Sequence, residues 1–488
     1  MIDHENAGVY NEMHGHFDEE AKAMKERILS MPDRKFTKNV HYVSPNGDDT
    51  ADGTTPETAW RTLDRVNEMQ DATEETAQVV LFERGGLWRG GIAARSWTVY
   101  SAYGEGEKPR FYGSIKDYAD ESLWSPDEAR ENVWKLSLAD WKGKFDGPFI
   151  TVRPSGKLEN HAGNILFIDG QGEVQMCGRR KNEDVLEAEF DYYHDEETGW
   201  LYLYYTGGNP AAKYAEIEIV PKYAIFRCCE HHHHIVIENL CMRYANFGVG
   251  AGHTAAHITV RGCEIGWIGG CFTSSPRERY GNGIEFYGST HDDIVENNWI
   301  YQCFDAGYTN QGRTPSDCWF RFKQQDILVQ NNLIEKCCYN LELWIGRNDM
   351  MRDCFYRDNI LRFAGYNFER YNRFGSSLIC ASHGCFMYSR KPMLNVVVMD
   401  NLMDYSYRHM YSVAYPNVNG KGPQIVNNQY AQRDAEEADI AFCWDIDDRD
   451  YVPSTHYYAR SEEMMKESVA KVDLAPRAVY FDGEATHE

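Results

Sequence analysis

The stretch that decides the fold reads GNGIEFYGSTHDDIVENNWIYQCFDAGYTNQG over 281–312 and RTPSDCWFRFKQQDILVQNNLIEKCCYNLELWIG over 313–346. Its two halves are versions of one unit. Each half has an apolar-rich run, an Asn-Asn pair (297–298 and 331–332), a second short apolar run, and a glycine fourteen residues after the second Asn. A supersecondary unit repeated at this spacing is typical of solenoid proteins, in which each repeat packs only on its neighbours.

The unit recurs through the second half of the chain. Alignment on the Asn position gives steps of 23, 36, 34, 27, 42 and 27 residues. A β-helix coil of about 22 residues with loops of varying length explains these steps. An Asn at a coil corner tolerates a left-handed backbone and can hydrogen-bond to the Asn above and below it. We therefore predict an all-β, right-handed parallel β-helix with corner positions at Asn239, Gly262, Asn298, Asn332, Asn359, Asn401 and Asn428.

Composition limits the partners. The chain has 488 residues, 42% of them hydrophobic, and a formal net charge of −25. A chain of this length exceeds one compact core, which favours an elongated repeat architecture. The acidic balance argues against a nucleic-acid partner, because binding to phosphates requires a basic surface. No apolar run is long enough to span a membrane, and the polar N-terminus has no secretion signal, so we expect a cytoplasmic protein. The oligomeric state stays open, with a homo-oligomer among the alternatives.

The fourteen cysteines agree with a reducing compartment, and none forms a CxxC pair. Cys303 and Cys337 each follow the second Asn of their unit by five residues, so we expect them to stack as small apolar residues inside adjacent coils. The run His231–His234 lies just before a strand, and we interpret it as a turn or exposed edge instead of a metal site. The acids Asp48, Asp49 and Asp52 fail the spacing of a calcium loop and indicate turns.

The remaining segments differ from the repeat. Helical periodicity predicts an N-terminal helix over 17–31 and a C-terminal one over 461–469, and Thr55 with Pro56 predicts the start of another helix. Residues 115–222 have the alternation and tight turns of antiparallel strands. We expect five parts: an N-terminal extension (1–40), a cap helix with the first coils (41–114), an inserted β-rich subdomain (115–222), the main β-helix with the groove (223–430) and a C-terminal capping segment (431–488).

Three segments carry a resemblance: YVSPNGDDTADGTTPETAWRTLDRVN (42–67), VVLFERGGLWRGG (79–91) and YSAYGEGEKPRFYGS (100–114). Together they resemble the entry to right-handed parallel β-helix carbohydrate-active enzymes, in which a helix covers the open end of the coil stack. The coils GNGIEFYG and FDAGYTNQG are similar to those of β-helix glycoside hydrolases, a group that includes exo-acting β-xylosidases. The resemblance covers about residues 40–430 and implies action on a glycan.

Carboxylates stand out in the central coils. Side chains alternate along a strand, so Ile284-Glu285-Phe286 and Leu341-Glu342-Leu343 should direct both glutamates outward. Counting from the Asn pair puts Tyr308 at the position of Glu342, with Asp305 three residues earlier, near a strand end or corner. Because stacked strands are about 4.8 Å apart, we expect Glu285 and Glu342 about 10 Å apart with Asp305 between them. Such a group suits glycoside hydrolysis, which needs a protonated and an ionised carboxyl group.

The loops around these acids fit a saccharide groove. Aromatic side chains stack on sugar rings, and cationic ones hydrogen-bond to hydroxyl groups or hold carboxylates. The candidate substrate-binding residues are Tyr287, Trp319 and Trp344 as platforms, and Arg313, Arg347, His383 and Arg408 as polar contacts.

The leading hypothesis is a glycoside hydrolase acting on a neutral oligosaccharide without a required cofactor. Asp305 would be nucleophile or base, Glu342 the general acid and Glu285 the third carboxylate, and these roles could be exchanged. A polysaccharide lyase acting on a uronate is the alternative, in which the acids would bind calcium (Ca2+) and Arg347 or Arg313 would be the base. A non-catalytic glycan-binding β-helix is a third. The sequence leaves the sugar, the linkage and the stereochemical outcome open.

Overall fold

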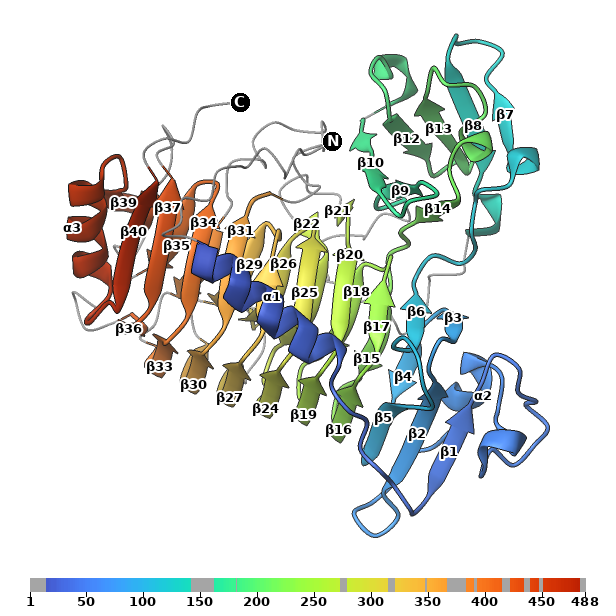
Figure 1. Ribbon diagram of the computed structural model, residues 1–488, viewed down its shortest axis with the longest axis horizontal. Coiled ribbons are helices and arrows are strands. Elements are labelled where there is room, and N and C mark those ends of the chain that lie inside the picture. The colour runs from blue at the N-terminus through green and yellow to red at the C-terminus, as the bar shows by residue number, and fades with distance from the viewer. Residues whose placement is uncertain are drawn as a thin grey trace.

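The chain is a parallel β-helix with three long sheets (Figure 1). The computed structural model describes residues 15–141, 162–180, 182–272, 279–314, 321–346, 349–366, 383–389, 393–414, 422–433, 439–446 and 451–482. From β2 to β38, each coil contributes one strand to each of the three sheets. Neighbouring strands in these sheets are parallel except for the pair β38–β39 at one end of its sheet, which is antiparallel. The predicted fold class is therefore confirmed.

The three sheets, A, B and C, have ten strands each. Sheet A contains β1 (Val40–Val43), β2 (Gln78–Glu83), β5 (Thr98–Tyr103), β16 (His233–Glu238), β19 (Ala256–Arg261), β24 (His291–Glu296), β27 (Lys323–Gln330), β30 (Met350–Arg357), β33 (Leu394–Met399) and β36 (Gln424–Val426). Sheet B contains β3 (Leu87–Arg89), β6 (Arg110–Tyr112), β17 (Cys241–Arg243), β20 (Glu264–Ile268), β25 (Trp299–Cys303), β28 (Leu333–Glu335), β31 (Ile360–Ala364), β34 (Leu402–Ser406), β37 (Gln429–Arg433) and β40 (Ala478–Asp482). Sheet C contains β4 (Ile92–Ala94), β15 (Ala224–Cys228), β18 (Phe247–Ala251), β23 (Asn282–Tyr287), β26 (Ala306–Gly312), β29 (Tyr339–Ile345), β32 (His383–Ser389), β35 (His409–Ala414), β38 (Asp439–Ile446) and β39 (Tyr451–Tyr458).

One continuous apolar core runs through the stack. It is built from inward-facing side chains of all three sheets, such as Val260, Ile300 and Leu341, which are buried. Cys303 and Cys337 belong to this core, as predicted. Among the described residues every free thiol except that of Cys229 is buried, and none forms a disulfide. Burial of this kind makes a thiol a packing group, because desolvation disfavours the reactive thiolate.

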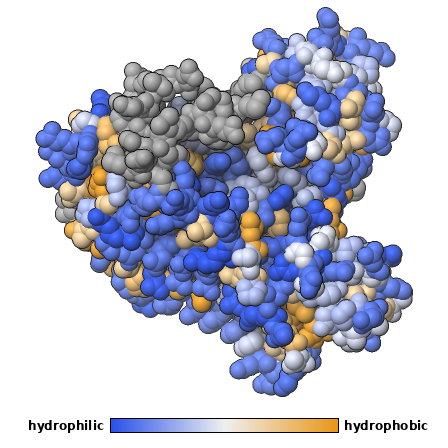
Figure 2. All heavy atoms as spheres, in the orientation of Figure 1, coloured by the Kyte–Doolittle hydropathy of each residue, from blue (hydrophilic) through white to orange (hydrophobic). Residues whose placement is uncertain are grey.

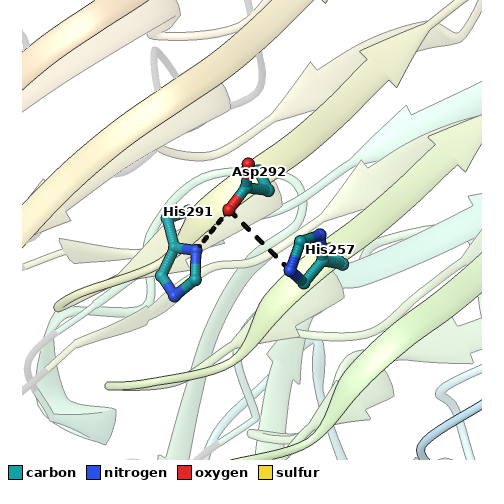
Figure 3. A group of neighbouring side chains, drawn as sticks. All are labelled: His257, His291 and Asp292. Carbon is teal, nitrogen blue, oxygen red and sulfur yellow. Dashed lines mark hydrogen bonds and ion pairs between the residues drawn. The ribbon is translucent and has the colours of Figure 1, made fainter.

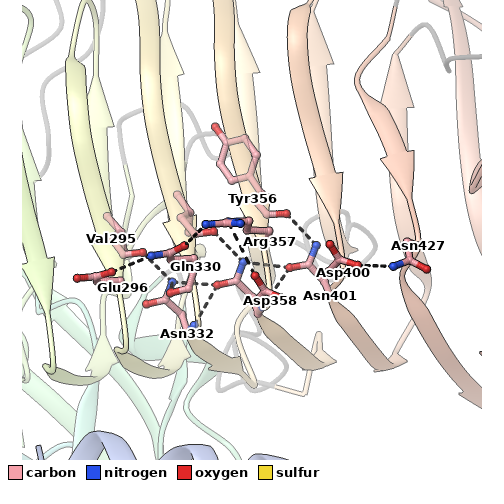
Figure 4. Close-up of polar contacts among 12 residues, drawn as sticks. Val295, Glu296, Gln330, Asn332, Tyr356, Arg357, Asp358, Asp400, Asn401 and Asn427 are labelled. Carbon is pink, nitrogen blue, oxygen red and sulfur yellow. Dashed lines mark hydrogen bonds and ion pairs between the residues drawn. The ribbon is translucent and has the colours of Figure 1, made fainter. Parts of the chain in front are cut away.

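The Asn pairs form the corner between sheets A and B (Figure 4). The second Asn of each pair is buried, and its side-chain N–H donates to the carbonyl oxygen of the next Asn side chain. These distances are 3.0 Å from Asn298 to Asn332, 2.9 Å from Asn332 to Asn359, and 3.0 Å from Asn359 to Asn401 and from Asn401 to Asn428. Each chain turn is thereby tied to its neighbour by buried hydrogen bonds.

The left-handed backbone belongs to the first residue of each pair, not to the residue that forms the ladder. Asn297, Asn331 and Asp358 have φ of 55° each. Asn239 and Gly262, at 57° and 62°, align with these first residues because Arg261 pairs with both Glu238 and Glu296. Placing Asn239 and Gly262 in the same column as Asn298 was therefore wrong by one residue. At each corner the first residue turns the chain, and the second forms the hydrogen bonds that buried backbone groups need.

Two helices cover parts of the stack. Helix α1 (Gly15–Leu29) confirms the N-terminal helix, and its Phe17, Ala21 and Ile28 pack on the first residues of sheet B strands, including Leu333 and Ile360 (Figure 1). Helix α3 (Glu462–Val472) begins after the N-cap Ser461 and confirms the C-terminal helix. After α3, the buried Asp473 accepts hydrogen bonds from the backbone and side chain of Asn428 and so ends the Asn ladder.

The helix predicted to start at Thr55 is replaced by two shorter elements. Thr55 caps a single 3-10 turn, Pro56–Thr58, and helix α2 (Leu63–Asn67) starts after a second cap, Thr62. Trp60 separates the two, because its backbone hydrogen-bonds to β1 through Tyr42 and Ser44. The paired extended backbone at Trp60 excludes one continuous helix. The acids of the preceding turn accept backbone hydrogen bonds, Asp48 from Thr50 and Asp52 from Thr54, as turn chemistry predicts.

A second core lies between the first and the later coils. It is built from β7 (Trp124–Pro126), β8 (Val133–Ser137), β9 (Ile165–Ile168), β10 (Val174–Met176), β11 (Gly178–Arg179), β12 (Asp191–Asp195), β13 (Trp200–Tyr204) and β14 (Glu216–Ile219). Their pairing is antiparallel except between β11 and β12. These strands project from the stack in Figure 1. A Cβ added to Gly270 would lie 2.0 Å from the Gly163 oxygen, so this part touches the coil that leads into β23.

The face that carries α1 is mostly hydrophilic, with apolar residues in small separate patches (Figure 2). This agrees with the strongly acidic composition. Among the described helices, none has the length and apolar character that a membrane crossing requires.

Candidate active site

The outer face of sheet C brings two of the predicted acids into one row. Glu285 on β23 pairs with Thr309 on β26, and Thr309 pairs with Glu342 on β29. Their neighbours Ile284 and Leu341 point into the core and are buried. Both glutamates therefore face outward, as alternation predicts, with their backbones two rungs or about 10 Å apart. Both are also 7% exposed and therefore buried.

Both carboxylates lean toward the coil between them. Thr309 Oγ1 donates to Glu342 Oε2 at 2.8 Å. Gln311 Nε2, on the same middle strand, lies 3.4 Å from Glu285 Oε2. Each carboxylate therefore has a hydrogen-bond partner on the middle strand. The site is thus a pair of carboxylates above one strand, β26.

The residue between the two glutamates is Thr309, so the prediction of Tyr308 at this position was wrong. Tyr308 points inward, is fully buried, and donates to Asn310 Oδ1 at 2.6 Å. The cause is the corner before each strand. Two residues separate β25 from β26, whereas Cys337 and Tyr339, the partners of Cys303 and Ala306 in the next coil, have one residue between them. Counting from the Asn pair misses this shift of one.

Asp305 lies on the coil between those of the glutamates, at the strand end where the sequence predicts it, but outside the glutamate row. It occupies the corner before β26, where its N–H donates to the Gly281 oxygen and its carbonyl accepts from Tyr339. Four residues along an extended strand put its backbone up to about 13 Å from Thr309. Burial raises the pKa of the Cys303 thiol, and Cys337 and Asp305 raise it further.

Asn282 links Glu285 to this corner, and simple alternation does not find it. Its Nδ2 donates to Glu285 Oε2 at 2.5 Å, and its Oδ1 accepts from the Ala306 N–H at 2.9 Å. Asn282 and Glu285 share a face although they are three residues apart, because Gly283 and Ile284 both point inward. A Cβ on Gly283 would lie 2.7 Å from Ile300 Cγ2 and 2.5 Å from the Gly307 oxygen, so only glycine fits.

A second outward row lies two residues further along the strands. Tyr287 pairs with Gln311, and Gln311 with Trp344. Tyr287 packs edge-on against Phe322 with ring centroids 6.0 Å apart, and Trp344 is half-buried. The two aromatic candidates therefore lie on the same side of the glutamate row, one on each side of Gln311. This is an arrangement in which a sugar ring above the carboxylates would meet an aromatic face.

The other predicted contacts are dispersed. Arg313 is exposed directly after β26, and Arg408 precedes β35. His383 begins β32 and pairs with Tyr339, but its side chain lies outside the described residues. Trp319 and Arg347 also lie outside the described residues.

The strand register places one further candidate, Arg227, in line with Glu285, and this residue was not predicted from the sequence. Arg227 on β15, Gly250 on β18 and Glu285 occupy one register position on successive strands. A Cβ on Gly250 would touch only Ala224, at 3.8 Å, and one on Gly252 would meet nothing within 4 Å. An open slot one strand wide therefore separates Arg227 from Glu285. Arg227 Nη1 is buried and has no hydrogen-bond partner among the described residues. No local pattern signals this residue, since it lies two coils before the acids.

The three sheets define a right-handed parallel β-helix. A solved structure of XylC with xylose is similar, with 13% identity and a TM-score of 0.50 over 91% of this chain and 82% of that chain. A structure described as a glycoside hydrolase has 10% identity and a TM-score of 0.42 over 92% of this chain and 97% of that chain. An alginate lyase from Paenibacillus sp. str. FPU-7 has 10% identity and a TM-score of 0.38 over 86% and 96%. At these identities the likeness concerns the fold.

No family model matches the chain. A segment of 81 residues is 31% identical to part of a linear gramicidin synthase from Brevibacillus parabrevis. That segment is 16% of this chain and spans only 2% of the other protein.

Proposed function

We propose that this chain is a glycoside hydrolase that cleaves a neutral oligosaccharide on the outer face of sheet C. The observation that carries the proposal is the pair Glu285 and Glu342, which share one outward row and both reach the strand between them. Glycoside hydrolysis needs one carboxylic acid to protonate the leaving oxygen and one carboxylate on the other side of the scissile bond. Two acids above one strand meet this requirement.

Roles follow from the donors around each acid. The amide groups of Asn282 and Gln311 donate toward one oxygen of Glu285, which stabilises negative charge there. We therefore assign Glu285 as the base that activates water and Glu342 as the general acid. The backbones are about 10 Å apart, a two-rung spacing that leaves room for a water between the acids. Inverting enzymes have carboxyl groups about 6.5–9.5 Å apart, so we assign this pair to inversion. Asp305, at the corner, takes the role of a substrate contact.

The row of Tyr287 and Trp344 supplies the platforms. Trp344→Ala is expected to raise KM by about tenfold or more with a smaller change in kcat, because stacking binds the ground state and the transition state alike. Initial rates over a range of substrate concentrations measure both constants. Leu394→Ala, at an exposed residue of sheet A, is the matched control and should leave both constants unchanged. A fall in kcat alone would contradict the platform role.

A substrate panel tests the proposed reaction. The purified chain is offered aryl glycosides of neutral sugars in the presence and absence of EDTA, and uronate polymers monitored by the ultraviolet absorbance of unsaturated products. Release of the aglycone, unaffected by EDTA, is the expected result. Unsaturated product that requires calcium would replace the hydrolase with a lyase. Binding of oligosaccharides without turnover of any substrate would indicate a glycan-binding protein.

A further inference from the structure

Two histidines and an aspartate meet on sheet A, on a different face of the coils from the glutamate pair. They are His257 on β19 and His291 and Asp292 on β24 (Figure 3). His291 Nδ1 lies 2.6 Å from Asp292 Oδ2, and His257 Nε2 lies 3.8 Å from the same oxygen. One ligand atom from each of the three residues lies within 4.8 Å of the other two. Among the described residues this is the one group of three or more metal-ligating side chains so close together.

The coil register sets this geometry. Ala256 pairs with His291, so His257 and Asp292 are neighbours on adjacent strands about 4.8 Å apart. Both have left-handed backbone, with φ of 54° and 56°. That conformation recurs at the same position in neighbouring coils, including His234 at 57° and Asp326 at 57°. The two residues are thus held by a repeated bend of a rigid sheet, which suits a preorganised site.

A neighbouring stack supports one of the rings. His234 stacks on His257 with centroids 4.3 Å apart, and Trp97 stacks on the other face of His234 at 3.9 Å. This stack of rings supports the imidazole of His257 from one side.

The donor set selects the kind of ion. Two imidazoles with one carboxylate suit zinc and similar transition metals, whereas calcium and magnesium prefer oxygen ligands. Metal–ligand bonds of about 2.0 Å in a tetrahedral site put donor atoms roughly 3.3 Å apart. The observed separations of 2.6 and 3.8 Å lie on either side of that value. The side chains are 40–43% exposed, so an ion can enter and keep a water as its fourth ligand.

We propose that His257, His291 and Asp292 form a binding site for Zn2+ or a similar divalent transition metal, which links the coils of β19 and β24. The bound ion joins two adjacent turns of the solenoid through side chains, in addition to their backbone pairing. Because the ion binds the folded chain, it raises the stability of the folded state.

Titration of the full chain, with any affinity tag removed, tests the site. Zn2+ is followed by calorimetry, and Co2+ by the visible absorption of a tetrahedral complex. We expect one ion per chain and an increase in Tm on addition of Zn2+. His257→Asn and His291→Asn should each weaken binding by more than tenfold and remove the increase in Tm.

The run His231–His234 requires its own control, since consecutive histidines also attract metals. His231→Asn is matched to the two test variants and leaves the three proposed ligands in place; it should bind Zn2+ like the parent chain. Loss of binding in His231→Asn with retention in His257→Asn would overturn the proposal in favour of the run. Absence of a saturable one-to-one complex in the parent chain would also overturn it. Circular dichroism shows that each variant is folded.

Discussion

Glu342→Gln is expected to lower kcat on a glycoside with a poor leaving group between about 100- and 10,000-fold, the range that a positioned general acid contributes. Glutamine keeps the shape of the side chain and its contact with Thr309, but it has no proton of suitable acidity for the leaving oxygen. Glu285→Gln should lose a similar factor, because the water then lacks its base. Initial rates with enzyme in the micromolar range measure both losses.

The two variants should differ in how their rates depend on the leaving group. Substrates with an activated leaving group need little protonation, so they should recover much of the rate in Glu342→Gln and little in Glu285→Gln. Nuclear magnetic resonance of the first-formed product should show inversion at the anomeric carbon. Retention would show that the pair is closer together than the two-rung spacing implies.

Asp305→Asn separates the pairing drawn from the structure from the one drawn from the sequence. Because Asp305 lies at the corner and not in the glutamate row, we expect a loss of roughly tenfold or less, mainly in kcat/KM. A loss in kcat as large as that of Glu342→Gln would make Asp305 one of the reacting carboxylates. Full activity in both Glu285→Gln and Glu342→Gln would refute the site.

Asn332→Leu is expected to destabilise the chain by about 3–5 kcal/mol, since several buried backbone groups lose their partners at once. Asn332 donates to the Val295 and Gln330 carbonyls and to Asn359, and it accepts from Asn298. Leucine has similar volume and no polar atom, so the cost comes from unsatisfied hydrogen bonds instead of a cavity. The midpoint of thermal or urea unfolding measures the change.

Asn331, the residue before Asn332, provides the control substitution. Asn331→Gly changes the preceding corner position, which has φ of 55°, a conformation that glycine adopts readily. It should shift stability by less than about 1 kcal/mol. Solenoids can open locally, so hydrogen exchange should rise first at β24, β27 and β30, the strands next to the altered rung. Equal effects of the two substitutions would show that the ladder does not carry the stability assigned to it.

The sequence by itself determined the solenoid and the outward direction of the two glutamates. Both are local properties: the Asn-Asn repeat marks a corner, and alternation around Glu285 and Glu342 sets the face of each strand. Helices α1 and α3 were also predictable, because the periodicity of their apolar residues lies within the helix itself.

The tertiary structure alone decided which side chains meet across coils. A corner with one residue more or less shifts every later position, so Thr309 and not Tyr308 stands between the glutamates. The paired glycine and isoleucine that bring Asn282 beside Glu285 depend on core packing behind the strand. Arg227, like the group formed by His257 and Asp292, comes from lateral stacking of coils. Spacing along the chain does not encode that stacking, because loops of different lengths separate the strands that it places side by side.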